Sequence, residues 1–149
     1  MTHAAEAKEP VRPPQAPPTL DLMGLSVHKG SRAGVVAYVE ASVAAARGGW
    51  IITPNLDHLR RVVKDPSQAA MYQGCDLCVA DGMPLVWGSR ILGEPLEGRV
   101  AGSDLIWDLS ASAARTGLPV IMLGGDPGAA EGAAEVLVAK YPGLQVAGM

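Results

Sequence analysis

The sequence predicts a Rossmann-like α/β fold, with a mostly parallel sheet that helices cover on both faces. Two observations support this class. Short apolar runs alternate along the chain with segments whose apolar residues recur at helical spacing. Glycine, proline or asparagine separates most of these segments. Because 149 residues leave room for one domain, we expect all the strands to share one sheet.

The first 18 residues differ in composition from the rest of the chain. They contain five of the 12 prolines and almost no large apolar residue. Such a segment cannot bury enough surface to offset its loss of conformational entropy. We therefore expect residues 1–18 to form a disordered tail and residues 19–149 to form the domain.

The first half of the domain shows the alternation clearly. Leu20–Val27, with Gly24 inside it, indicates two short extended segments and a hairpin. Ser31 is placed to cap a helix that runs to Arg47 and stops at two glycines. Trp50–Thr53 predicts a strand, and a further helix follows the turn at Pro54 and Asn55.

The second half repeats this order. The predicted elements are a strand at 77–80, a helix from Pro84 to Gly93, a helix capped by Ser103, a strand at 120–123, an alanine-rich helix ending at Lys140 and a strand at 144–147.

Charge and hydropathy exclude several classes of protein. The formal net charge is −3, with a pI near 5.5, which disfavours nucleic acid as a partner. The sequence contains neither a signal-peptide pattern nor about 18 consecutive apolar residues. We therefore expect a cytosolic protein.

Cys75 and Cys78 form a C-x-x-C pair, which could be a redox pair or half of a zinc site. A redox pair normally stands at a helix N-terminus, whereas these residues lead into an apolar run. A second cysteine pair that would complete four zinc ligands is absent from the sequence. We favour a structural role for both cysteines.

In a parallel sheet, ligands bind outside the carboxyl ends of the strands. Thr53 and Asn55 follow one predicted strand and can aim a hydroxyl and an amide into a cleft, although Asn55 is equally suited to cap the next helix. Asp81 follows the next strand and could be a general base, a metal ligand or a cap. The D-x-D pattern of many metal-dependent nucleotide-sugar enzymes is absent, which disfavours metal-dependent transfer.

Two further segments carry groups suited to phosphate. Arg99 stands just before the predicted helix that begins at Ser103. A guanidinium beside a helix N-terminus is suited to bind a diphosphate. The alternative is a solvated surface arginine, which is commoner for any single arginine. Gly124 and Gly125 form a turn before a helix but lack the G-x-G-x-x-G register. NAD is therefore disfavoured, while a nucleotide phosphate at this turn is not.

Taken together, these motifs resemble the WecG/TagA/CpsF family of bacterial glycosyltransferases. Their order and spacing agree with the family from about Leu20 to the end of the chain. The matching stretches are Thr53-Pro54-Asn55, residues 80–86, residues 99–105, and Leu123-Gly124-Gly125 followed by residues 133–144.

The resemblance implies an activity. Members of the family transfer an N-acetylmannosamine-type or related sugar from a UDP donor to a polyprenyl-diphosphate-linked sugar, with inversion and without a required metal or other cofactor. They act in the synthesis of teichoic acids, enterobacterial common antigen and other surface polysaccharides. The resemblance makes Asp81 the general base, places Thr53 and Asn55 in the sugar pocket, and assigns Arg99 to the diphosphate and Gly124 and Gly125 to UDP.

Family members extend beyond the strand that ends here near Met149, with a C-terminal segment whose basic residues help bind the diphosphate and associate with the membrane. We therefore expect residues 19–149 to be the family domain without its C-terminal part, to bind UDP-sugar weakly and to be inactive alone. We expect peripheral contact of the full-length form with the inner face of the plasma membrane, and an alanine- and valine-rich surface is consistent with a homo-oligomer. A second hypothesis is a non-catalytic nucleotide-sugar binding module.

Overall fold

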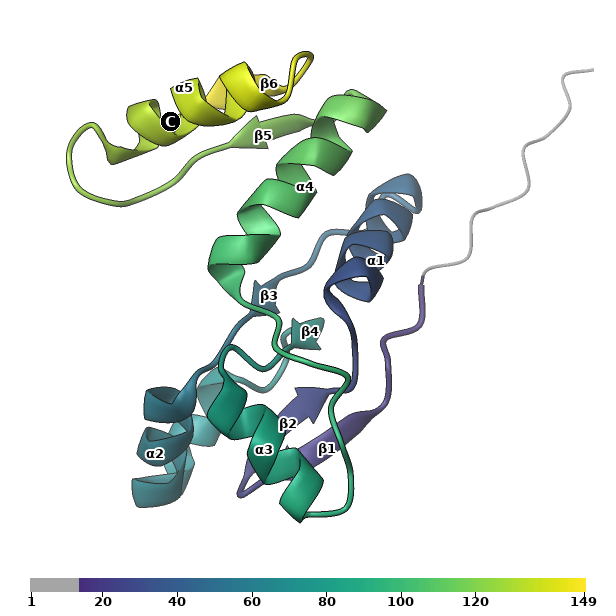
Figure 1. Cartoon of the computed structure of the whole chain (residues 1–149), viewed down its shortest axis with the longest axis vertical. Coiled ribbons are helices and arrows are strands. Elements are labelled where there is room, and N and C mark those ends of the chain that lie inside the picture. The colour runs from purple at the N-terminus through teal and green to yellow at the C-terminus, as the bar shows by residue number, and fades with distance from the viewer. Residues whose placement is uncertain (1–13) are drawn as a thin grey trace, which may run out of the picture.

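The computed structural model describes residues 14–149 (Figure 1); residues 1–13, most of the expected tail, lie outside this range. The elements are β1 (Thr19–Leu22), β2 (Leu25–His28), α1 (Arg32–Ala44), β3 (Ile51–Ile52), α2 (Leu56–Lys64), the 3-10 helix η1 (Pro66–Met71), β4 (Leu77–Cys78), α3 (Met83–Ile91), α4 (Gly102–Thr116), β5 (Pro119–Ile121), α5 (Ala129–Lys140) and β6 (Gln145–Gly148).

The hairpin predicted around Gly24 is confirmed. β1 and β2 pair antiparallel, with Leu20 opposite Val27 and Leu22 opposite Leu25. These four side chains are buried, whereas the residues between them are mostly exposed, so one face of the hairpin contributes to the core. The buried face packs with Cys78, Ala80, Leu85 and Leu96.

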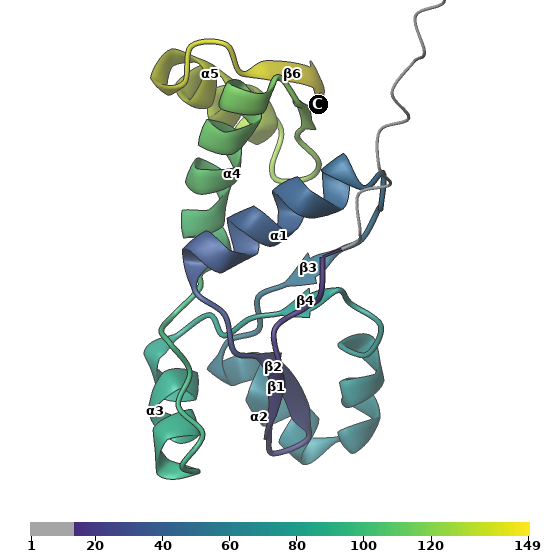
Figure 2. The same cartoon turned by 90° about the vertical axis from the view of Figure 1, so that its right-hand side faces the viewer.

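The mixed α/β class is confirmed, but the strands do not form one mostly parallel sheet. They form three sheets of two strands each, in which β3–β4 and β5–β6 are parallel. The β5–α5–β6 unit lies at one end of the molecule, against the C-terminal part of α4, whereas α2 and α3 lie at the other end (Figures 1 and 2).

This separation has a physical cause in the packing of the C-terminal unit. Ala113 of α4 is buried together with Met122, Leu137 and Leu144 of the unit, and these residues form a core distinct from the two cores around β3 and β4. One apolar face of α5 is thus covered within the unit without a strand from elsewhere, whereas Ile121 of β5 and Val136 of α5 stay exposed.

One predicted helix cap is confirmed and another is wrong. The Ser31 side chain accepts the N–H of Gly34 and caps α1 as predicted. Ser103, in contrast, lies inside the first turn of α4, whose N-cap is Ala101. The start of α4 is fixed by tertiary contacts, because the Val100 N–H donates to the Ala80 carbonyl at 2.8 Å and holds this segment beside the end of β4.

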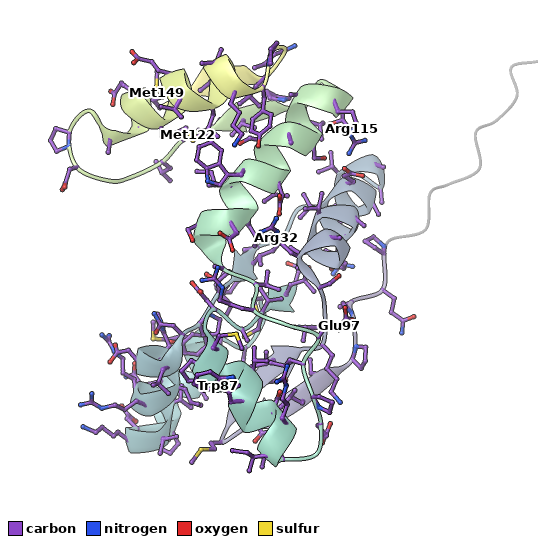
Figure 3. All side chains as sticks on the ribbon, viewed as in Figure 1. Arg32, Trp87, Glu97, Arg115, Met122 and Met149 are labelled. Atoms are coloured by element: carbon purple, nitrogen blue, oxygen red, sulfur yellow. The ribbon has the colours of Figure 1, made fainter. Side chains whose placement is uncertain are left out.

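Ion pairs join α1 to α4. The guanidinium of Arg32 contacts both Asp104 and Asp108, and Figure 3 shows Arg32 between the two helices. Near the other end of α4, Arg115 pairs with Glu40 of α1. Among residues 14–149, no helix has both the length and the apolar composition that a membrane span requires.

We predict that His28 makes the fold sensitive to mild acid. Its Nδ1 accepts the N–H of Cys78 at 2.9 Å, which joins β2 to β4, and burial lowers the imidazole pKa from its ordinary value of 6.5. The unfolded chain therefore binds this proton more tightly than the folded chain does, so the free energy of unfolding falls as the pH drops through about 6.5 and below. Urea denaturation across this range should show the loss.

The matched variant is His28→Asn, whose side chain does not titrate. Its stability should change less between neutral pH and about pH 5.5. A hydrogen bond from Ser112 lowers the pKa of Glu40 from its ordinary value of 4.5, and one from Ser67 lowers the pKa of Asp65 from 3.8. The contributions of these two carboxylates to the free energy of unfolding are therefore lost only at lower pH. An equal pH dependence in the variant and the wild type would contradict the assignment to His28.

Candidate functional site

The carboxyl ends of β3 and β4 lie side by side and bring three segments together. The Asp81 N–H donates to the Pro54 carbonyl at 2.9 Å and continues the parallel pairing beyond β3. On the other side of β4, the Val100 N–H donates to the Ala80 carbonyl. As the sequence predicts, residues 53–55, residue 81 and residue 99 therefore belong to one region of the molecule.

A cleft of about 460 Å³ opens between the start of α2 and the start of α3. Asp81 is partly buried in its wall. The next residue, Gly82, has a φ of +135° and lets the chain turn into α3. No side chain caps α3, so Asp81 does not act as a cap for this helix. The cleft is lined by Asn55, Leu56, Asp57, Arg60, Asp81, Gly82 and Pro84.

Asn55 lines the cleft and also caps α2. Its Oδ1 accepts the N–H groups of Asp57 and His58 at 3.0 and 3.3 Å, and the Asn55 N–H donates to the His58 ring. Of the two roles that the sequence leaves open for Asn55, the cap is confirmed. Because the cap occupies Oδ1, the group of Asn55 with unused capacity toward a ligand is its amide NH₂.

Thr53 lies against the start of α4 rather than in this cleft. A Cβ added at Gly102 would stand 3.1 Å from its Oγ1, so the glycine allows the helix to approach β3 closely. Thr53 lines a neighbouring cavity of about 440 Å³ along β3, together with Trp50, His58 and Tyr72. The structure thus places Thr53 and Asn55 on different surfaces of the same strand end.

Arg99 lies beside the N-terminus of α4, as predicted. Its Nη2 is 2.7 Å from Oδ2 of Asp104, in the first turn of the helix, and the Arg32 guanidinium is 3.6 Å from the same oxygen. The Arg99 side chain is 45% exposed, and no side chain caps α4. The combination of a guanidinium and free helical N–H groups is suited to an anion.

Gly124 and Gly125 are not brought to the cleft. Both have positive φ, of 90° and 92°, in the loop between β5 and α5, and this loop belongs to the C-terminal unit, away from α2 and α3 (Figures 1 and 2). Their contact with UDP stays a prediction.

Sequence reasoning missed Arg60 and Leu56. They stand one helical turn apart on α2, and both line the cleft opposite Asp81. Their spacing places both residues on one face of α2, but it does not indicate that this face adjoins the start of α3.

The two cysteines occupy a structural position. Cys78 is buried in β4 and Cys75 is partly buried. Burial raises the pKa of the Cys75 thiol and raises that of the Cys78 thiol to about 12, which opposes thiolate chemistry. Within the described range, no group of three or more His, Cys, Asp or Glu residues is arranged to hold a metal ion.

Comparison with known proteins identifies the family. Residues 20–149 match the glycosyl transferase WecG/TagA/CpsF family, and the chain belongs to it. Over 102 residues it is 28% identical to the N-acetylglucosaminyldiphosphoundecaprenol N-acetyl-beta-D-mannosaminyltransferase of Bacillus spizizenii. The match covers 68% of this chain and 40% of the relative, so the matched region spans less than half the length of that protein.

We predict that the structural role of Asn55 can be separated from a binding role. Asn55→Ala removes the cap and should lower the free energy of unfolding by about 1 kcal/mol, measured by urea denaturation. Asn55→Ser retains a capping oxygen but lacks the amide NH₂, so it should keep most of the stability. Equal destabilisation by both variants would contradict the assigned cap.

Proposed function

We propose that this protein transfers an N-acetylmannosamine-type sugar from a UDP donor to a polyprenyl-diphosphate-linked sugar, with inversion and without a metal. The observation that carries the proposal is the Asp81 carboxylate in a cleft at the carboxyl end of β4, with Arg60 in the same cleft and Arg99 at the adjoining helix N-terminus. Membership of the family supports the reaction class. The activity for which the Bacillus relative is named supports the sugar and the acceptor.

The proposed chemistry is a single displacement. The Asp81 carboxylate takes the proton from the acceptor hydroxyl while the oxygen of that hydroxyl forms a bond to the anomeric carbon of the donor sugar. The bond from that carbon to the diphosphate breaks, and UDP departs with the electron pair. Because the acceptor attacks the face opposite UDP, the configuration at the anomeric carbon inverts.

Positive groups stabilise the departing diphosphate. Arg99, whose guanidinium also pairs with Asp104, and the uncapped N-terminus of α4 supply charged and backbone donors, which is how a site can stabilise a leaving phosphate without a metal. Arg60 adds a second guanidinium from the α2 side of the cleft. The roles of Gly124 and Gly125 at UDP require the C-terminal unit to lie nearer the cleft, in a single parallel sheet.

The proposed acceptor also specifies a location. A polyprenyl chain is confined to a bilayer, so the enzyme works at the cytoplasmic face of the plasma membrane as a peripheral protein. Self-association would be consistent with its apolar exposed residues.

A second candidate is a non-catalytic module that binds nucleotide-sugar. The placement of Gly124 and Gly125 in the loop between β5 and α5, and not in the lining of the cleft, favours it, because the cleft then retains anion-binding groups without all of the residues assigned to the donor.

We predict that Arg99 contributes to UDP binding. Hydrogen bonds to charged groups contribute about 1.5–3 kcal/mol, so Arg99→Ala should raise the Kd for UDP about tenfold or more in calorimetric titration without added metal. Arg47→Ala is the control, because Arg47 is also paired with an aspartate and its side chain has a similar exposure of 47%. Equal affinities of wild type and Arg99→Ala would contradict the assignment.

We predict that Asp81→Asn abolishes transfer while retaining UDP binding, because an amide cannot take the acceptor proton. The measurement is chromatographic detection of the disaccharide formed on a polyprenyl-diphosphate-linked N-acetylglucosamine. Glu135→Gln also turns a carboxylate into an amide, but on α5 and outside the cleft, and should leave transfer unchanged. Transfer by Asp81→Asn at the wild-type rate would exclude Asp81 as the base, and transfer by the wild type would overturn the expectation that residues 19–149 are inactive alone.

A further inference from the structure

Two helices beside the cleft expose apolar side chains instead of burying them. On α3, Trp87 and Ile91 are 55% and 86% exposed, and Arg90 lies on the same helical face. The opposite face of α3 is the buried one and carries Leu85, Val86 and Ser89. The exposed apolar residues are therefore additional to those that attach the helix to the core.

The same pattern occurs on α2. Leu56, Arg60 and Val63 follow the spacing of one helical face, and Leu56 and Val63 are 52% and 46% exposed. Leu56 and Arg60 line the cleft together with Pro84 of α3, so this side of α2 lies next to the start of α3. Figure 3 shows Trp87 on α3, at the same end of the molecule as α2. We call the six residues Leu56, Arg60, Val63, Trp87, Arg90 and Ile91 the α2–α3 face.

The charge of these helices is opposite to that of the chain. α2 and α3 carry four basic residues, Arg60, Arg61, Lys64 and Arg90, against one acidic residue, Asp57. Their formal charge is thus +4 −1, or +3, whereas the whole chain has −3. Exposed tryptophan and aliphatic side chains next to arginine and lysine are typical of surfaces that bind anionic lipid.

We propose that the α2–α3 face docks on the surface of an anionic bilayer. Apolar side chains enter the boundary between head groups and acyl chains, and the basic residues contact lipid phosphates. The cleft containing Asp81 opens between the same two helices, so docking places its mouth at the membrane. The choice of partner rests on the proposed function, because only a lipid-linked acceptor requires the cleft to open there.

The test is sedimentation of the whole chain with vesicles of phosphatidylcholine, with and without phosphatidylglycerol. The wild type should bind the anionic vesicles, bind the neutral ones poorly, and dissociate as salt is added. Trp87→Ser/Ile91→Ser should weaken binding by about tenfold or more. Arg90→Ser should weaken it by about fivefold.

Matched controls lie elsewhere on the molecule. Leu123 and Val136 are 95% and 55% exposed in the C-terminal unit, so Leu123→Ser/Val136→Ser removes similar exposed apolar surface away from the α2–α3 face. Arg47→Ser changes the net charge as Arg90→Ser does. Both controls should bind vesicles like the wild type, and all the variants should unfold at the wild-type temperature by circular dichroism.

Several results would overturn the proposal. One is the absence of wild-type binding to anionic vesicles, and another is an equal loss of vesicle binding in the Leu123→Ser/Val136→Ser control. A third is a wild-type dimer in sedimentation velocity that Trp87→Ser/Ile91→Ser dissociates, because a second copy of the chain would then occupy the α2–α3 face. UDP titration of the same samples separates the two proposals. UDP binding without vesicle binding contradicts only the docking surface, and vesicle binding without UDP binding contradicts only the proposed function.

Discussion

The parallel pairing of β3 with β4 is the interaction on which the site depends. It is short, with two residues of each strand in register, but the bond from the Asp81 N–H to the Pro54 carbonyl extends it to the point where both strands end. α2 and α3 begin directly after these ends, so the cleft between them follows from the register. A slip of one residue would turn Asp81 to the other face of the sheet.

Local features of the fold could be predicted from the sequence, whereas tertiary ones could not. The hairpin, the Ser31 cap and the Asn55 cap depend on residues within a few positions of each other. The start of α4 depends instead on the contact of Val100 with Ala80. The division into three sheets depends on which apolar faces cover each other, as Met122 and Leu137 do in the C-terminal unit, and the spacing of apolar residues does not specify those partners.

The candidate site divides in the same way. Asp81 and Arg99 could be singled out because they follow predicted strands or precede predicted helices. Arg60 could not, because a basic residue on an amphipathic helix usually faces solvent, and only the adjoining start of α3 makes it part of a cleft. The pairing of Arg99 with Asp104 could not be predicted from the sequence either. In the proposed role of Arg99, the diphosphate competes with the Asp104 carboxylate for the guanidinium or shares the guanidinium with it.

The most direct test of the account maps the backbone N–H resonances of the folded chain by NMR while UDP is added. The account predicts shifts concentrated at residues 53–56, 80–84 and 99–104, which surround the cleft and the start of α4, with smaller changes in the 3-10 helix η1. Shifts confined to the residues around Cys75 and Cys78 or to the C-terminal end of α1, or no shifts at saturating UDP, would contradict a nucleotide-sugar site at the carboxyl ends of β3 and β4.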